Sequence, residues 1–196
     1  MAESGENPWL WIIAGPNGSG KTTFARRFVP VITSGAPFIN VDDMARDIDP
    51  GDVDGAARRA GTLAIKAIEA HIGSRASFAI ETTLSGRYQQ RLATRAIAEG
   101  WRLGFVYLWI GDPKISIHRI ALRVADGGHH VPDEVVHRRF RRGLANLPRY
   151  LQMAERASIY DNIAPTPYLV ATFDKGDAAV LDVARYAEIE LNWTQT

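Results

Sequence analysis

One stretch of nine residues constrains this chain more than any other. It comprises Gly15, Pro16, Asn17, Gly18, Ser19, Gly20, Lys21, Thr22 and Thr23. An apolar run, residues 9–14, precedes it and predicts a buried strand, and residues 23–28 predict the first turns of a helix. Glycines at fixed positions let the backbone curl until its N–H groups face a phosphate, and the helix N-terminus adds a favourable dipole. The spacing and this context indicate a phosphate-binding P-loop rather than a glycine-rich turn that matches by accident.

A P-loop binds the phosphates of a nucleoside triphosphate together with Mg²⁺. Lys21 is expected to reach the outer phosphates and to act in catalysis, and the Thr22 hydroxyl is expected to hold Mg²⁺. We therefore predict that residues 15–23 bind ATP and that Mg²⁺ accompanies it. The motif does not identify the group that receives the phosphate.

The order of apolar runs and turn residues predicts one domain over residues 1–196, with strands alternating with helices. Strands are expected at residues 9–14, 38–41, 76–80, 103–110 and 168–173. The first helix is expected to begin after residue 22, and further helices are expected to span residues 55–71, 86–99, 113–124, 133–147, 148–160 and 178–190. Loops are expected at residues 30–37 and 47–54. This alternation predicts an α/β fold of three layers, in which helices flank a parallel sheet, and thus a P-loop NTPase or kinase fold.

Composition excludes several kinds of site. The chain has no cysteine, which rules out disulfides, thiolate metal sites and cysteine nucleophiles. Its first eight residues are polar and acidic, unlike a secretory signal, and no apolar run is long enough to span a membrane. We therefore expect a cytoplasmic protein that does not contact membranes.

Positive charge is concentrated between residues 119 and 149, although the net charge of the chain is only +1. This segment contains only three acidic residues but seven arginines, which are Arg119, Arg123, Arg138, Arg139, Arg141, Arg142 and Arg149. The rest of the chain is net negative. A local arginine cluster in such a chain indicates a discrete anionic ligand more than a nucleic-acid surface.

Acidic residues follow the second and third predicted strands. Ligands of parallel sheets bind at the carboxyl ends of the strands, so these residues are candidates for chemistry on the triphosphate. Asp42 is the candidate general base, because a hydroxyl that attacks phosphorus must lose a proton, and it would also contact the acceptor. Its alternative role is a helix N-cap, which Asp43 could fill instead.

The third strand ends in Glu81-Thr82-Thr83. Glu81 is expected to bind the acceptor or a water on Mg²⁺, with a loop hydrogen bond as the alternative, and Thr82 and Thr83 are weaker candidates for the acceptor site. Asp112 comes after the next strand and before Pro113, which favours a helix cap over a magnesium-binding acid.

The arginine cluster predicts a helical lid at about residues 123–149. Arg123 comes before the flexible pair Gly127-Gly128, and Arg139 and Arg142 follow it on a basic helix. Such a lid would close on ATP and stabilise the charge of the transferred phosphoryl group, although a solvated basic helix face is the alternative. His129 and His130 have no carboxylate or third histidine at a ligand spacing, so a metal site there is not expected.

Taken together, the motifs resemble the zeta-toxin family of P-loop kinases, particularly its shorter, stand-alone bacterial members. The resemblance rests on the P-loop, residues 40–43 (Asn-Val-Asp-Asp), residues 80–86, residues 127–132 (Gly-Gly-His-His-Val-Pro), residues 138–140 and residues 146–147. Members of this family use ATP and Mg²⁺ to phosphorylate a sugar hydroxyl of UDP-N-acetylglucosamine. The resemblance also implies an antitoxin protein as partner.

The resemblance implies roles for individual residues. Asp42 would be the base, Glu81 would contact the sugar, and Lys21 and Arg123 would contact phosphate. The second lid arginine of the better-known toxins falls near His129, so Arg139 or Arg142 is expected to take its place.

We therefore predict an ATP-dependent kinase that transfers the γ-phosphoryl group to a sugar hydroxyl, with a nucleotide sugar such as UDP-N-acetylglucosamine as the favoured acceptor. Three alternatives remain at this point. The first is a P-loop ATPase or nucleotide switch that acts on a protein partner. The second is a kinase for another small hydroxyl compound. The third, binding of RNA or DNA through the basic helix, is disfavoured because the basic stretch is short.

Overall fold

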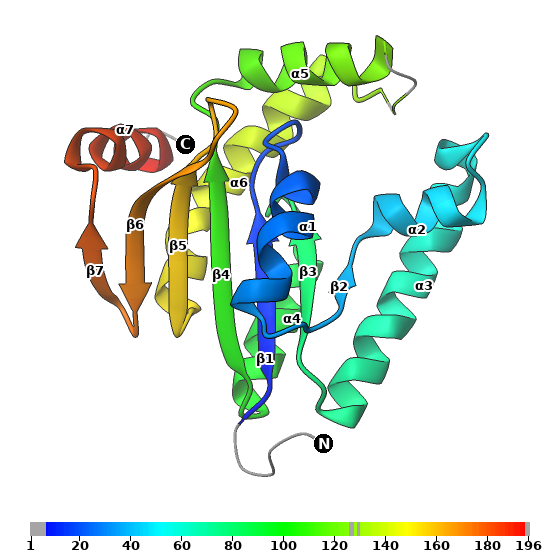
Figure 1. The fold of residues 1–196 in the computed structure, drawn as a ribbon, viewed down its shortest axis with the longest axis horizontal. Coiled ribbons are helices and arrows are strands. Elements are labelled where there is room, and N and C mark those ends of the chain that lie inside the picture. Colours follow the sequence, from blue (N-terminus) through cyan, green and yellow to red (C-terminus); the bar gives the residue numbers. More distant parts are fainter. Residues whose placement is uncertain (1–6, 126–127, 129, 195–196) are drawn as a thin grey trace.

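A mixed, seven-stranded sheet forms the centre of the fold in the computed structural model, which describes residues 7–125, 128 and 130–194 (Figure 1). Within these residues the strand order is β2-β3-β1-β4-β5-β6-β7. The bounds are β1 (Trp9–Ala14), β2 (Phe38–Ile39), β3 (Phe78–Thr82), β4 (Arg102–Trp109), β5 (Arg156–Asp161), β6 (Tyr168–Asp174) and β7 (Asp177–Val180). The first five strands in the sheet order pair in parallel, whereas β6 and β7 are antiparallel. The predicted parallel sheet is thus confirmed at its centre and wrong at its β6–β7 edge.

Helices cover both faces of this sheet, which confirms the predicted three layers. Their bounds are α1 (Lys21–Ile32), α2 (Val41–Ile48), α3 (Val53–Ser74), α4 (Tyr88–Ala98), α5 (Pro113–Ala125), α6 (Asp133–Met153) and α7 (Val183–Thr194). Alternate residues of a strand point to opposite faces. On one face Trp11 and Ile13 of β1 pack with Phe24 and Val29 of α1, and on the other Leu10 and Ile12 share a core with α3, α4, α6 and α7.

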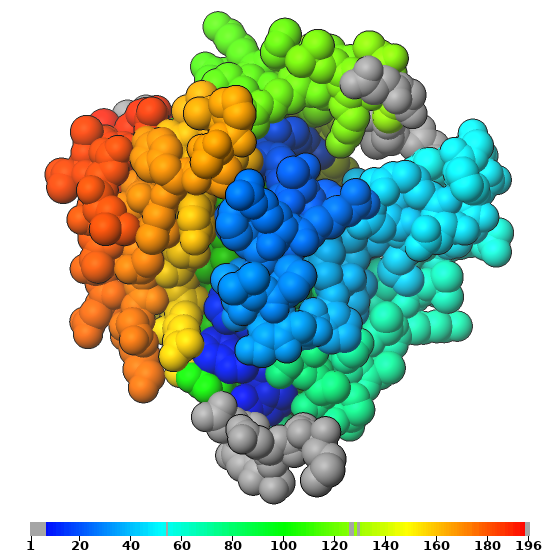
Figure 2. Space-filling model, in the orientation of Figure 1, coloured from blue at the N-terminus to red at the C-terminus, as the bar shows by residue number. Residues whose placement is uncertain are grey.

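Helix α1 crosses the front of the sheet in Figure 1, and α4 and α6 lie behind it. Figure 2 shows that the outer surface of α1 occupies the middle of the front face. Helix α1, which follows the P-loop, therefore lies between helices α2 and α3 on one side and strands β5 and β6 on the other.

The register of the parallel strands brings their carboxyl ends to one edge of the sheet. Ala14, the last residue of β1, pairs with Thr82 of β3 and with Tyr107 of β4, and Trp109 of β4 pairs with Asp161 of β5. Loops that follow these four strands consequently meet at the same edge. The P-loop, which follows β1, is in the middle of this edge because β1 is the central one of the five strands that pair in parallel.

The predicted helix at residues 148–160 is confirmed as far as Met153 and wrong beyond it. Helix α6 continues through Pro148 to Met153, and residues 156–161 form strand β5 instead. A proline inside a helix removes one hydrogen bond, but Leu144, Leu147 and Leu151 bury their side chains in the core on either side of it and keep the helix continuous. In β5, buried and more exposed residues alternate with a period of two, as expected for a strand.

Other element boundaries also differ from the prediction. Helix α1 extends three residues into the predicted loop at 30–37, and α3 continues past Gly73. Helix α2 begins at the last residue of the predicted strand 38–41 and includes the first two residues of the predicted loop 47–54. Residues 177–180 form β7 rather than the start of a helix. Lys175 and Gly176 have φ of 50° and 94°, so they form the tight turn that reverses β6 into β7.

None of the helices in the described residues is both long enough and apolar enough to cross a membrane. The polar N-terminal segment, residues 1–6, lies outside the described residues.

Candidate active site

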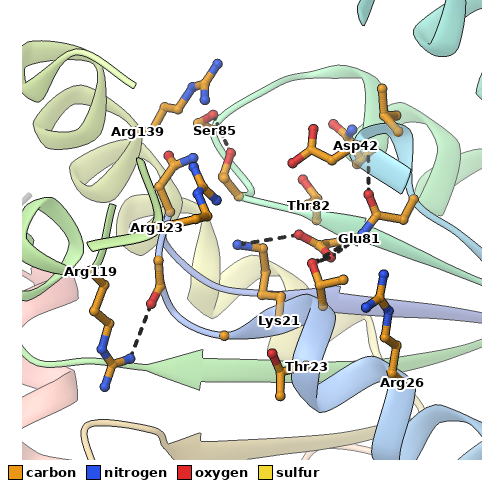
Figure 3. Close-up of a pocket in the computed structure, with 18 of the residues that line it drawn as sticks. Lys21, Thr23, Arg26, Asp42, Glu81, Thr82, Ser85, Arg119, Arg123 and Arg139 are labelled. Carbon is orange, nitrogen blue, oxygen red and sulfur yellow. Dashed lines mark hydrogen bonds and ion pairs between the residues drawn. The ribbon is translucent and has the colours of Figure 1, made fainter. Parts of the chain in front are cut away.

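A cavity of about 710 Å³ opens beside the P-loop at the carboxyl edge of the sheet. The P-loop and the start of α1, the first turn of α2, the turn after β3, α4, α5 and α6 all contribute to its walls. The predicted site residues among its lining are Asn17, Gly18, Gly20, Lys21, Thr22, Thr23, Asp42, Glu81, Thr82, Thr83, Arg123 and Arg139. Segments far apart in the sequence are therefore brought together around one space (Figure 3).

The P-loop has the curled backbone that its glycines predict. Gly18 and Gly20 adopt φ of 69° and 78°, a region that favours glycine. A Cβ atom at Gly20 would lie 2.7 Å from the side-chain nitrogen of Asn162, so there is no room for a side chain. Asn17 Oδ1 and Ser19 Oγ are buried without a hydrogen-bond partner in the described protein. These orphaned polar atoms and the glycine-lined curve suit a phosphate ligand.

Lys21 is buried at the floor of the cavity, next to Glu81. Its Nζ donates a hydrogen bond of 2.8 Å to the Pro16 carbonyl and lies 3.8 Å from Glu81 Oε1. Burial lowers the pKa of Lys21, and the nearby Glu81 carboxylate opposes this shift. Burial likewise raises the pKa of Glu81, and Lys21 opposes that shift. Each group therefore offsets part of the effect of burial on the pKa of the other.

Asn40 connects Glu81 to the first turn of α2. Its Nδ2 donates to Glu81 Oε2 at 2.8 Å, and its Oδ1 accepts from the backbone N–H groups of Asp42 and Asp43 at 2.8 and 3.3 Å. The Thr22 hydroxyl donates to the same Glu81 oxygen at 2.9 Å. Asn40 is therefore the N-cap of α2, which rules out the alternative role of Asp42 or Asp43 as the cap.

The two acidic residues of α2 have different surroundings. Asp43 accepts hydrogen bonds from Arg26 of α1, at 2.9 Å, and from Arg46 one turn along α2. Asp42 lines the cavity and, in Figure 3, lies across it from Arg123 and Arg139. Only Asp42 thus faces the space in which an acceptor could meet a phosphate.

The turn after β3 is held tightly against α6. Leu84 is buried with φ of 57°, an uncommon conformation for a residue other than glycine, and its N–H donates to Thr82 Oγ1 at 3.0 Å. Asn146 Nδ2 donates to the Leu84 carbonyl at 2.7 Å, and a Cβ at Gly143 would lie 2.6 Å from the Thr83 carbonyl oxygen. The turn therefore has one well-defined position, set by contacts with a helix more than 50 residues away along the chain.

These contacts also limit the predicted lid. From Phe140 onward α6 buries Leu144 and Leu147 in the main core, so the segment 123–149 is not one separate unit. At its other end Val131 and Val136 pack against Ile120 of α5. Residues 126, 127 and 129, which include one glycine of the predicted flexible pair Gly127-Gly128, lie outside the described residues.

Arg119 connects α5 to the P-loop. Its guanidinium donates to the Gly18 carbonyl at 3.2 Å and to the carbonyls of Asn162 and Ile163 at 2.9 and 2.7 Å. Asn162 in turn donates from Nδ2 to the Ser19 carbonyl at 2.6 Å. Figure 3 shows Arg119 beside the P-loop, below Arg123. The loop after β5 and helix α5 thus contact the P-loop from the same side.

A second cavity of about 270 Å³ adjoins the first. It shares Gly18, Gly20, Thr23 and Arg119 with the larger cavity. The rest of its lining is Phe24, Arg27 and Phe28 of α1, and Asn162, Ala164, Pro165 and Pro167 of the loop after β5. The P-loop therefore has a polar cavity and a more apolar one next to it.

The chain was compared with known protein families, and residues 10–148 match the family AAA_33, described as an AAA domain. The chain belongs to this family. It is also 34% identical, over 147 residues, to an uncharacterized protein of Haemophilus influenzae (strain ATCC 51907 / DSM 11121 / KW20 / Rd), which covers 67% of this chain and 96% of that relative.

Two solved structures have the same fold as this AAA domain. A chain of the AvrRxo1-ORF1:-ORF2 complex solved with ATP has a TM-score of 0.70 and 19% identity, covering 94% of this chain and 64% of the other. The present chain thus spans just under two thirds of that protein. A structure from the PezAT chromosomal toxin–antitoxin system of Streptococcus pneumoniae has a TM-score of 0.61 and 16% identity, covering 98% and 88%. At these identities the likeness shows the P-loop kinase fold and no more.

Some predicted residues of the AAA domain lie away from the cavity. Arg142 is exposed and is not part of the cavity lining, and Gly15, Pro16 and Ser19 form the body of the P-loop beneath it. Asp112 Oδ1 accepts from the Lys114 N–H at 2.7 Å, which confirms the predicted helix cap. Among the described residues no group of three or more histidines or acids could hold a metal ion by itself.

Sequence reasoning missed several residues that line or support the cavities: Arg26, Asn40, Arg46, Ser85, Gln89 and Asn162. It placed Arg119 in the arginine cluster but gave it no role of its own. A signal existed for Asn40, because asparagine directly before a helical segment favours an N-cap. For Asn162 the signal was hidden, since the strand that it follows was predicted as helix.

Proposed function

We propose that this protein is a kinase that transfers the γ-phosphoryl group of ATP to a hydroxyl of a small acceptor, and that the acceptor is a nucleotide sugar such as UDP-N-acetylglucosamine. One observation carries the proposal: the Asp42 carboxylate lines the same cavity as the P-loop residues Lys21 and Thr22, and lies across it from Arg123 and Arg139. A base, a phosphate site and cations around one space are what phosphoryl transfer to a hydroxyl requires. The volume of about 710 Å³ suits a small-molecule acceptor.

The second cavity is the proposed site of the nucleoside part of ATP. Phe24, Phe28, Pro165 and Pro167 give it apolar walls, and the Arg119 guanidinium supplies a planar cation. It shares glycines with the P-loop, so a nucleoside there and phosphates in the P-loop would belong to one continuous ligand.

The residues beside the P-loop also fit Mg²⁺, which commonly combines one or two protein carboxylates or hydroxyls with waters and phosphate oxygens. Thr22 Oγ1 and Glu81 Oε2, hydrogen-bonded to each other at 2.9 Å, form an all-oxygen donor set of this kind. We propose that Thr22 contacts the ion and that Glu81 holds one of its waters. When bound, Mg²⁺ would neutralise charge on the phosphate oxygens. The contact of Glu81 with Thr22 and Lys21 favours this role for Glu81 over a direct contact with the sugar.

In the proposed reaction the acceptor hydroxyl gives its proton to the Asp42 carboxylate while its oxygen bonds to the γ-phosphorus. The bond between that phosphorus and the bridging oxygen breaks, and ADP leaves. Lys21, Arg123 and Arg139 stabilise the negative charge on the transferred group. Thr82 and Thr83 line the acceptor side, but the hydroxyl of Thr82 is already an acceptor for the Leu84 N–H.

We further propose an antitoxin-like protein partner and a cytoplasmic location, as the zeta-toxin resemblance implies. The AvrRxo1 structure is of an ORF1:-ORF2 complex, and the PezAT structure comes from a toxin–antitoxin system. These descriptions apply to those proteins and support the proposal by analogy of fold.

Phosphorus NMR of the purified protein with ATP, Mg²⁺ and UDP-N-acetylglucosamine tests the proposed reaction. A no-acceptor sample, Asp42→Asn and Asp43→Asn run beside it. Asp43→Asn is the matched control, because it removes a neighbouring carboxylate that Arg26 and Arg46 hold outside the reaction path. We expect a new phosphomonoester signal that needs the acceptor, disappears in Asp42→Asn and persists in Asp43→Asn. Free phosphate alone, equal with and without acceptor, would instead favour the ATPase or switch.

A further inference from the structure

The buried carboxylate of Asp161, at the end of β5, joins three segments of the chain. Only 2% of this residue is exposed. Its Oδ1 accepts a hydrogen bond of 2.8 Å from the Ile163 N–H, and its Oδ2 lies 2.7 Å from Arg185 Nε. The Tyr168 hydroxyl of β6 donates to Oδ2 at 3.2 Å. A buried charge needs such partners, so Arg185 of α7 holds Asp161 in place.

The loop that Asp161 holds leads directly to the P-loop. Asn162 donates to the Ser19 carbonyl, and the carbonyls of Asn162 and Ile163 accept from Arg119. Pro165 and Pro167, further along the loop, line the second cavity. Because proline fixes φ, this short loop has few ways to adjust within itself. A shift at residues 161–163 would therefore move the cavity wall.

Arg185 lies in a part of the chain outside residues 10–148, which match the AAA domain family. It belongs to the first turn of α7, where its backbone N–H donates to Asp182 Oδ1 at 2.9 Å. Helix α7 packs on α6 and β6, and its buried Ile189 belongs to the main core. The C-terminal unit β6–β7–α7 thus holds Arg185 firmly enough to fix a second group.

We propose that Arg185 is a positioning residue for nucleotide binding: through Asp161 it sets the loop 162–167, which forms one wall of the cavity that receives the nucleoside. This inference rests on the proposed function, in which ATP spans the P-loop and the second cavity. Arg185 does not line that cavity, so its effect passes through Asp161. Replacing Arg185 should therefore weaken the binding of ligands that contain a nucleoside and leave the binding of ligands that consist only of phosphate unchanged.

Calorimetric titration of the full chain with ATP, and separately with inorganic tripolyphosphate, tests this inference. Arg185→Gln should raise the Kd for ATP about fivefold to tenfold, the order expected for one displaced hydrogen-bonded wall, and change the Kd for tripolyphosphate by less than about twofold. Arg185→Lys, which keeps the charge, should restore part of the affinity. Glu188→Gln is the matched control, because Glu188 contacts the same guanidinium from the exposed side of α7. It should leave both affinities unchanged.

Thermal unfolding of each variant shows whether it is folded. If Arg185→Gln does not fold, Tyr168→Phe takes its place: it removes one donor to Asp161 but keeps the ion pair, and should weaken ATP about twofold with tripolyphosphate unchanged. Equal weakening of both ligands, or no change in either, would overturn the positioning role. If the wild-type protein binds ATP no more tightly than tripolyphosphate, the positioning role is also overturned, but the proposed phosphate site is not. A wild-type protein that binds neither ligand would overturn the proposed function itself.

Discussion

The Asn40 side-chain amide donates a hydrogen bond of 2.8 Å to Glu81 Oε2. The other end of the same amide caps α2, the helix that carries Asp42. One buried side chain therefore fixes both the carboxylate beside the P-loop and the helix of the proposed base. The distance between these two acids depends on a residue that performs no chemistry itself.

Replacing Asn40 should therefore impair catalysis as well as stability. In Asn40→Ala we expect a loss of about 1–2 kcal/mol in the free energy of unfolding, from the lost cap, and at least roughly a tenfold fall in kcat. Urea unfolding and a kinase assay measure the two effects. Asp52→Ala is the matched control, because Asp52 caps α3 through the Gly55 N–H and lies away from the cavity. If both variants lose equal stability and equal activity, the link between Asn40 and the site is refuted.

Glu81 predicts a pH dependence of stability. Its pKa in the folded protein lies above 4.5, chiefly because of burial, so the folded protein binds more protons than the unfolded chain above that pH. The stabilisation that Glu81 adds to the free energy of unfolding is therefore fully present below pH 4.5 and is lost as the pH rises through the folded-state pKa of Glu81. We expect the free energy of unfolding of the wild type, minus that of Glu81→Gln, to fall as the pH rises from about 4 to about 7. Denaturant titrations at several pH values would show this trend, and a rising difference would contradict it.

Gly143 should tolerate no side chain, because a Cβ there would lie 2.6 Å from the Thr83 carbonyl oxygen. Gly143→Ala should push the turn after β3 out of place, costing about 1–3 kcal/mol of stability and lowering kcat. Gly73→Ala is the control: it is also helical, but nothing lies within 4 Å of its Cβ position, so stability should stay the same or rise slightly. Thermal unfolding and initial rates measure both. A fully active and stable Gly143→Ala would show that the turn can move freely.

Arg139 and Arg142 are the two residues predicted to take the place of the second lid arginine, and their replacement should affect kcat to different extents. Arg139 lines the cavity, whereas Arg142, one turn along α6, is exposed and outside its lining. Arg139→Ala should lower kcat by roughly a hundredfold, the order seen when a group that stabilises transferred charge is removed, and Arg142→Ala should change it less than about threefold. Steady-state kinetics with saturating ATP compares them. A larger loss in Arg142→Ala would mean that the lid closes with a different face of α6 toward the phosphate.

The sequence alone predicted the fold class and the P-loop, because the features that determine them are contiguous. A strand, a glycine loop and a helix in immediate succession form a P-loop from local interactions, without distant partners. The positions of Asp42 and Glu81 could be predicted for a similar reason: both come just after or at the end of a strand, and parallel pairing brings strand ends together.

Only the tertiary structure decided the rest. Pro148 predicted the end of a helix, but burial of the leucines on both sides outweighs one lost hydrogen bond, and the displaced boundary hid strand β5. That error also hid Asn162, whose contact with Ser19 spans 143 positions. Asn40, Arg119 and Asp161 acquire their roles from partners that no local pattern encodes. A short motif fixes the curve of the P-loop, whereas long-range packing decides which side chains line the two cavities beside it.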